Sequence, residues 1–256
     1  MPNPTATKFY VRHREGYAET EIQDFARRGF WLMGVELGTY EWIDDIDAME
    51  DLGPTVGVAG YIGDVFRGLK KLGRPAPEPL DYPEPLTEFL GRRVWSGTLD
   101  EVTRSHTRVF VKPVEQKAFT GFVWENDHVS RMRVIAHHGH TPVFISEPLV
   151  IVSEYRSFIL HGEILGCRLY KGDWSKAPSR AVVESAVEAM LPIAPVAFCL
   201  DWGVTDGGRT ILVEANDSFA FGHYGLHPGY VAHMLSARWF ELCGGVGAST
   251  EKIGGY

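Results

Sequence analysis

The stretch from Ala197 to Asp217, AFCLDWGVTDGGRTILVEAND, joins two apolar runs through a glycine-rich turn. Apolar runs on both sides of such a turn are typical of a β-hairpin. If the two adjacent glycines occupy the central turn positions, Asp201 lies opposite Glu214 on the neighbouring strand. Asn216 follows two residues later and therefore projects from the same face. The hairpin thus predicts two carboxylates and one amide oxygen at one end of a two-stranded ribbon.

The polar end of this hairpin is a candidate metal site. Carboxylates beside apolar neighbours are costly unless a cation or hydrogen-bond donors satisfy them. Mg²⁺ typically takes one or two carboxylates and completes its shell with water and phosphate oxygens, and Asp201, Glu214 and Asn216 form such a set. The alternative is that they are ordinary polar residues at strand ends. A shift of one residue in register would also separate the two carboxylates.

The composition is that of a globular protein. Of 256 residues, 45% are hydrophobic and 23% charged, and the formal net charge is −8. An acidic chain has no general attraction for nucleic acid or anionic membranes, and no apolar run approaches the ~18 residues of a spanning helix. Three cysteines without a CxxC spacing and a polar start indicate a cytoplasmic protein with reduced thiols. We expect neither nucleic acid nor a membrane as a partner, and the composition indicates no oligomeric state.

The first ninety residues have the pattern of a small α/β unit. Phe30–Val35 and Val56–Ala59 are short apolar runs typical of buried strands. Tyr61–Leu72 shows helical spacing of its apolar residues, and Gly73 follows as a stop signal.

A proline-rich segment then separates this unit from the rest of the chain. Residues 74–86, RPAPEPLDYPEPL, contain five prolines, a density that excludes helix and central strand. We interpret the segment as a linker and predict two domains, residues 1–90 and residues 91–256.

The second domain alternates short strands with two amphipathic helices. The strands are expected at Val109–Pro113, Gly121–Trp124, Val143–Val152 with a break at Glu147-Pro148, Tyr155–Leu160, Ile164–Tyr170 and in the acidic hairpin; the helices are expected at Ser179–Leu191 and Tyr230–Leu242.

Two lysines are candidates for holding an anion. Lys112 lies inside the apolar run VFVKP, where a lysine needs an anionic partner; the alternative is a lysine that extends to solvent from a strand end. Lys117 follows shortly afterwards, and Gly121 would let the backbone approach a phosphate.

Two arginines lie on the arms of a further hairpin around His161-Gly162. If the loop has three residues, Arg156 pairs with Arg168 on one face; if it has two, they point to opposite faces. Adjacent guanidiniums repel each other unless an anion lies between them, and phosphate suits both forks. The alternative is a solvated sheet edge.

Several other residues are less informative. The extended segment Ile145–Tyr155 could present backbone groups to a flat base, although a plain core strand gives the same pattern. His137, His138 and His140 favour a surface loop over a metal site, because no cysteine or carboxylate stands at metal-binding spacing. Candidates for lining a substrate pocket or for recognising a substrate carboxylate are Asp217, Ser218 and His223, and Arg12, Arg14, Arg92 and Arg93, each arginine alone being more typical of a solvated surface.

Together these motifs resemble the ATP-grasp superfamily over roughly residues 90 to 240, and most specifically in the Glu-x-Asn hairpin preceded by an aspartate. Their order is similar to that of glutamate-adding and D-Ala–D-Ala-type ligases, and closest to a small branch in bacteria and phages with paired arginines and a lysine. The implied fold is α/β (α+β): a small N-terminal pre-ATP-grasp domain followed by two α+β subdomains that clamp ATP. One departure is DSFAFGHYG after Glu-x-Asn, where members often have a small residue, proline and glycine.

The resemblance implies a role for each matching position. Lys112 and Lys117 would contact ATP phosphates, and one of them the base. Glu147 and the backbone near Val150 would lie at the adenine and ribose. Arg156 and Arg168 would hold the γ-phosphate or an acyl phosphate. Asp201, Glu214 and Asn216 would ligate one or two Mg²⁺ ions.

The implied reaction is phosphorylation of a carboxylate by ATP, followed by attack of an amine and release of ADP and phosphate. The substrate could be a small molecule, an amino acid or a peptide. The alternatives are a kinase on the same scaffold, which needs one acceptor only, and a nucleotide-binding module without turnover.

Overall fold

The N-terminal unit is built on a three-stranded parallel sheet with the order β2-β1-β3. The computed structural model describes residues 6–14, 21–105, 107–115 and 118–245. Its first elements are β1 (Lys8–Arg12), α1 (Glu21–Leu32), β2 (Glu36–Tyr40), the 3₁₀ helix η1 (Ile43–Ala48), β3 (Val56–Ala59) and α2 (Ile62–Lys71). The strand at Val56–Ala59 and the helix before Gly73 are therefore confirmed.

The prediction of a strand at Phe30–Val35 is wrong. Its first residues complete α1, whose buried side chains include Ala26 and Phe30, one helical turn apart. Gly34, with a φ of 69°, then ends the helix in the left-handed conformation. The apolar run thus belongs to a helix end and a tight turn.

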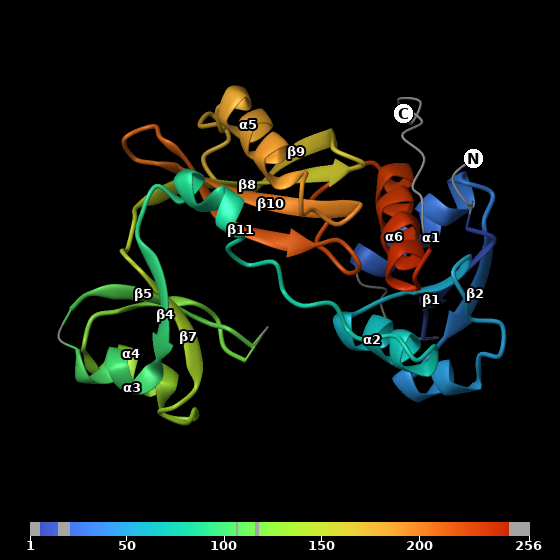
Figure 1. Ribbon diagram of the computed structural model, residues 1–256, viewed down its shortest axis with the longest axis horizontal. Coiled ribbons are helices and arrows are strands. Elements are labelled where there is room, and N and C mark those ends of the chain that lie inside the picture. The colour runs from blue at the N-terminus through green and yellow to red at the C-terminus, as the bar shows by residue number, and fades with distance from the viewer. Residues whose placement is uncertain (1–5, 15–20, 106, 116–117, 246–256) are drawn as a thin grey trace.

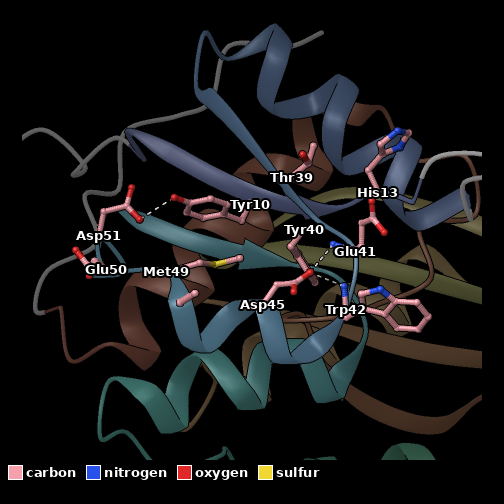
Figure 2. A pocket seen from close by; sticks show the side chains of 11 residues that line it. Tyr10, His13, Thr39, Tyr40, Glu41, Trp42, Asp45, Met49, Glu50 and Asp51 are labelled. Carbon is pink, nitrogen blue, oxygen red and sulfur yellow. Dashed lines mark hydrogen bonds between the residues drawn. The ribbon is translucent and has the colours of Figure 1, made fainter.

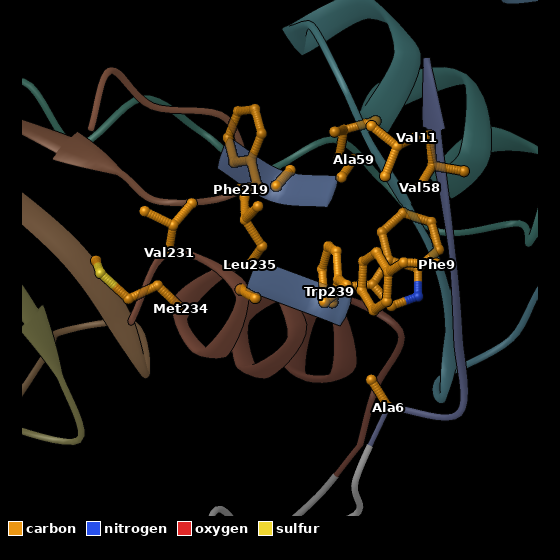
Figure 3. Packing of buried hydrophobic residues seen from close by; sticks show 14 of the residues in the cluster. Ala6, Phe9, Val11, Val58, Ala59, Phe219, Val231, Met234, Leu235 and Trp239 are labelled. Carbon is orange, nitrogen blue, oxygen red and sulfur yellow. The ribbon is translucent and has the colours of Figure 1, made fainter. Parts of the chain in front are cut away.

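The last helix of the chain, α6 (Pro228–Leu242), returns to this unit and completes its core. It packs beside α1, where a side chain at Gly29 would place its Cβ 2.1 Å from the Pro228 carbonyl oxygen. Trp239 of α6 lies against Phe9 of β1 in the buried cluster of Figure 3, and its indole N–H donates to the Gly53 carbonyl.

A second body, seen at the lower left of Figure 1, carries a separate antiparallel sheet with the order β4-β7-β5-β6. Its core is one cluster in which α3 and α4 pack on the sheet. Its elements are β4 (Val94–Thr98), α3 (Leu99–Arg104), β5 (Val109–Pro113), β6 (Phe122–Trp124), α4 (His128–Val134) and β7 (Pro142–Ser146).

The third body is an antiparallel sheet with the order β11-β10-β8-β9. One face packs on α5 (Arg180–Met190) and the 3₁₀ helix η2 (Glu84–Leu90), and the other on the N-terminal unit and α6. Every residue of β10 is buried between them. The strands are β8 (Ile151–Leu160), β9 (Glu163–Gly172), β10 (Ala197–Thr205) and β11 (Thr210–Asp217).

Both hairpins of this sheet reach their predicted pairing through a bulge. In the first hairpin Leu160 pairs with Glu163 across the two-residue turn, yet a register shift beyond Ile159 still pairs Arg156 with Arg168. In the second, Val204 pairs with Thr210, so the two glycines are not the centre of the turn. A shift between Asp201 and Trp202 restores the predicted register at the polar end.

The proline-rich segment crosses from α2 to η2, as Figure 1 shows. It contains no strand beyond an isolated bridge between Asp81 and Ala215. The predicted division of the chain near residue 90 stays a prediction.

No helix within the described ranges has both the length and the apolar character needed to cross a membrane.

Candidate functional site

A cleft of about 930 Å³ lies where β5 and β7 of the second body face β8 and β11 of the third. The N-terminal unit contributes Gly60, Tyr61 and Ile62 to its wall. Its volume is in the range of small-molecule sites. Lys112, Gly121, Glu147, Arg156, Glu214 and Asn216 of the predicted site line this cleft.

A row of four charged residues crosses the third sheet. Strand pairing places Arg168 of β9 beside Arg156 of β8, Arg156 beside Asp201 of β10, and Asp201 beside Glu214 of β11. Directly paired residues project from the same face of a sheet. The predicted arginine pair and the predicted acidic pair therefore form one continuous line.

Arg156 and Asp201 form the buried centre of this row. Arg156 donates from Nε to Oδ1 of Asp201 at 2.7 Å and from Nη2 to Oδ2 at 2.6 Å. The ring of Tyr224 lies 5.1 Å from the guanidinium. Burial disfavours the charge on Arg156, but Asp201 outweighs this and raises the pKa of Arg156. Burial raises the pKa of Asp201, and Arg156 opposes that rise. This contact orients the Asp201 carboxylate.

Lys112 reaches across the cleft to the other end of the row. Its Nζ donates to Oε2 of Glu214 and to Oδ1 of Asp81, each at 2.6 Å. Burial would lower the pKa of Lys112, but Glu214, Tyr82 and Asp81 raise it well above its usual value. Burial would raise the pKa of Glu214, but Lys112 and Asn216 lower it. The anionic partner expected for Lys112 is therefore present within the protein.

Asn216 joins the two carboxylates. Its Nδ2 donates to Oδ2 of Asp201 and to Oε1 of Glu214, both at 3.1 Å. Among the described residues no three His, Cys, Asp or Glu side chains come together as a metal-binding group. Two carboxylates that converge on one amide, beside a cleft, are nevertheless the donor set that Mg²⁺ takes when phosphate and water complete its shell. The three residues fit a magnesium ion of this kind.

The segment between β7 and β8 forms one end of the cleft, as predicted. Oε2 of Glu147 accepts from the backbone N–H of Arg93 at 3.0 Å. The Val150 side chain is 63% exposed and does not line the cleft, and its carbonyl accepts from the N–H of Asp206. Leu149 and Ile151, the neighbours of Val150, do line it.

Glu154 is a cleft residue that sequence reasoning missed. It precedes Arg156 by two residues on β8 and so projects from the same face. Tyr170 donates to it from its hydroxyl at 3.1 Å, and Lys171 from Nζ at 2.5 Å. The signal that could have found Glu154 is its spacing from Arg156.

The predicted phosphate-binding stretch before β6 is described only in part. Lys117 lies outside the described residues. Gly121 lines the cleft, and a Cβ there would lie 2.7 Å from the Phe110 ring. Close packing of the strand therefore already requires glycine at this position.

Arg92 has a structural role rather than a free guanidinium. It donates from Nη1 to the carbonyls of Leu90 and Leu212 and from Nη2 to that of Val213. Its neighbour Arg93 is exposed and stacks 5.0 Å from the Trp95 ring. Arg92 thus ties the start of the second body to β11.

Two further arginines lie in the N-terminal unit. Arg12 pairs with Asp64 at 3.4 Å, and Arg14 stacks 4.1 Å from the Trp42 ring. Neither lines the cleft.

The residues after the Glu-x-Asn motif differ in position. Asp217 lines the cleft, but Arg238 of α6 donates to both its oxygens from Nε and Nη2. Ser218 is fully buried, and His223 is buried with its ring stacked 3.5 Å from that of Phe25. Neither Ser218 nor His223 lines the cleft.

The histidine-rich stretch is a loop between α4 and β7, as favoured by the sequence. The rings of His138 and His140 stack at 5.4 Å, and His137 contacts Phe119.

A second pocket lies on the outer side of the N-terminal unit, and its acidic groups are already engaged. Figure 2 shows Asp51 accepting from the hydroxyl of Tyr10, and Asp45 accepting from the backbone N–H groups of Glu41 and Trp42. These carboxylates hold the local backbone and a neighbouring side chain, so the chemistry-bearing groups gather in the other cleft.

Comparison with known families gives one match. An ATP-grasp domain family, the second family of the clade named for two arginines and a lysine, matches residues 89–234, more than half of the chain. No curated protein matches the chain.

Solved structures of similar fold cover nearly all of the chain. D-alanine–D-alanine ligase from Bacillus anthracis complexed with ATP has a TM-score of 0.57 and 14% identity, covering 94% of this chain and 100% of that one. N5-carboxyaminoimidazole synthetase from Staphylococcus aureus has 0.59 and 11%, covering 92% and 78%. The ATP-grasp ligase PsnB, complexed with a phosphomimetic variant of its minimal precursor, Mg and ADP, has 0.52 and 13%, covering 93% and 99%. The expected fold is confirmed.

Proposed function

Because the chain belongs to this second family of the two-arginine, one-lysine clade of ATP-grasp domains, we propose that it is an ATP- and magnesium-dependent ligase that joins a carboxylate to an amine. The reaction would form an acyl phosphate and release ADP and phosphate. Complexes with ATP, and with Mg and ADP, among the similar structures support the choice of nucleotide and metal.

The observation that carries the proposal is the row from Arg168 to Glu214, with Lys112 facing its acidic end across the cleft. Phosphoryl transfer needs positioning and charge neutralisation more than covalent help from the protein. Asp201, Glu214 and Asn216 would hold magnesium, which neutralises phosphate charge when bound. A local set of cations also allows a chain with net charge −8 to bind a polyanion.

In the proposed reaction an oxygen of the substrate carboxylate attacks the γ-phosphorus, the bond to the β-phosphate oxygen breaks, and ADP leaves. The amine nitrogen then attacks the acyl carbon, phosphate leaves, and the amine loses a proton. Arg168 is exposed and forms no ion pair within the described part of the chain, so its guanidinium is available to the transferred phosphoryl group. Arg156 holds Asp201 in place.

The acceptor is a small molecule, an amino acid or a peptide. The similar structures include a ligase named for D-alanine and a macrocyclase, MdnC, bound to a precursor peptide. Both kinds of substrate therefore belong in the test.

The test is detection of ADP release with Mg-ATP and pools of amino acids, dipeptides and longer peptides. A ligase releases ADP only when acid and amine are both present, and Glu214→Gln abolishes the release while Glu188→Gln, on the exposed face of α5, does not. Release with a single acceptor would indicate a kinase. A chain that binds Mg-ATP with no release for any pool would be a nucleotide-binding module, and a chain that does not bind it contradicts the proposal.

A further inference from the structure

The linker places one acidic residue at the edge of the nucleotide cleft. Asp81 lies before the residues that the family matches. Its backbone carbonyl accepts from the N–H of Ala215 at 2.8 Å, in an isolated bridge to the free edge of β11. Ala215 stands between Glu214 and Asn216, so the linker docks directly on the acidic end of the row.

The side chain of Asp81 enters the cleft and contacts Lys112. Its backbone has a φ of 44°, in the left-handed region that aspartate and asparagine tolerate better than most residues. Its Oδ1 lies 2.6 Å from Nζ of Lys112, and its side chain is 15% exposed. Asp81 and Lys112 both line the cleft.

The charges at this corner do not balance in favour of a nucleotide. Lys112 donates to two carboxylates, those of Asp81 and Glu214, and its ammonium has three N–H donors in all. One positive charge faces two negative ones, so the corner is anionic before any ligand arrives. A free triphosphate meets repulsion there, and little of the Lys112 charge is available to it.

We propose that Asp81 masks Lys112 and thereby makes nucleotide binding depend on a divalent cation. The inference rests on the proposed function, because it takes the cleft as the nucleotide site. A cation that draws Glu214 away leaves Lys112 with one carboxylate partner and a free N–H for phosphate. Asp81, fixed to β11 through its backbone, keeps the ammonium at the cleft and acts as a positioning residue.

The experiment measures the dissociation constant of AMP-PNP by calorimetry, in Mg²⁺ and in EDTA, for the wild type, Asp81→Asn and Glu78→Gln. Asparagine keeps the left-handed backbone and removes the charge. We expect Asp81→Asn to bind metal-free AMP-PNP about fivefold more tightly or better, the lower end of coupling between sites, so that the ratio of the two constants falls. Glu78→Gln removes an exposed carboxylate of the same linker and leaves the ratio unchanged.

An unchanged ratio in folded Asp81→Asn overturns the inference and leaves the proposed function intact. Weaker binding in both media overturns it too, because Asp81 would then hold the site together instead of masking it. If the wild type binds no AMP-PNP in Mg²⁺, the proposed function fails as well. Thermal unfolding checks the fold, and Asp81→Gly, which relaxes the left-handed backbone, replaces Asp81→Asn if that variant does not fold.

Discussion

Arg156 and Asp201 face each other on adjacent strands and share two hydrogen bonds of 2.7 and 2.6 Å. Their side chains are 10% and 4% exposed, so the pair is almost withdrawn from water. Removing one partner of such a pair leaves an uncompensated buried charge. Arg156 therefore belongs first to the stability of the site, whereas Arg168, its neighbour in the row, is exposed.

The two arginines are expected to separate stability from function. Arg156→Met should lower the free energy of unfolding by about 3–5 kcal/mol, because Asp201 stays buried without its partner. Arg168→Met should change it by less than about 0.5 kcal/mol but reduce ADP release at least about tenfold. Urea unfolding and the coupled assay measure the two effects. Equal destabilisation by both substitutions would contradict the assignment.

Replacing Lys112 should change how stability depends on pH. In the wild type the pKa of Glu214 is lowered, so its contribution is present above the ordinary carboxyl range and is lost as pH falls through the folded-state pKa. In Lys112→Met burial dominates and raises that pKa, so stability falls as pH rises. The deficit against the wild type should grow from about pH 3 to about pH 7, reaching about 1–3 kcal/mol.

Urea unfolding at several pH values measures this deficit, with the exposed Lys70→Met as the matched control. A deficit that stays constant across this acidic to neutral range would show that Lys112 does not control the ionisation of Glu214.

Arg92 should resist even a conservative change. Arg92→Lys loses the planar fork that serves the carbonyls of Leu90, Leu212 and Val213, which one ammonium does not reproduce. The expected loss is about 1–3 kcal/mol in the free energy of unfolding. Arg93→Lys, exposed at the next position, should cost less than about 0.5 kcal/mol. Equal costs in chemical denaturation would remove the structural role given to Arg92.

Glu154 is expected to contact the ribose. It lies in the cleft on β8, between the segment after β7 and Arg156, and a carboxylate accepts hydrogen bonds from ribose hydroxyls in other nucleotide sites. Glu154→Gln should weaken ATP binding about tenfold and leave the affinity for 2′,3′-dideoxy-ATP almost unchanged. Calorimetry with both nucleotides measures the difference. A parallel loss for both would place Glu154 away from the ribose.

The sequence predicted the polar ends of both hairpins better than their turns. Asp201 faces Glu214 although the two glycines are not the centre of the turn. Arg156 faces Arg168 although the two-residue turn should have set them apart. Each bulge falls at residues with no turn signature, so turn chemistry alone does not reveal it.

Contacts made across the fold were harder to predict. The sequence places Asp81 only in a linker, and its role follows from its bridge to Ala215 and its contact with Lys112. The strand expected at Phe30–Val35 failed because a short apolar run can equally end a buried helix. Local pattern predicted which residue types carry the chemistry, while long-range packing decides which of them are engaged.

The bulges also bear on how this fold tolerates change. In each hairpin the irregularity lies between the turn and the charged row, so an alteration in turn length can be absorbed before it reaches Asp201 or Arg156. The outer loops at His161 and Gly207 are therefore suitable positions for inserting a peptide tag or a fluorescent reporter. Related chains can differ there in length and still align the same four charges.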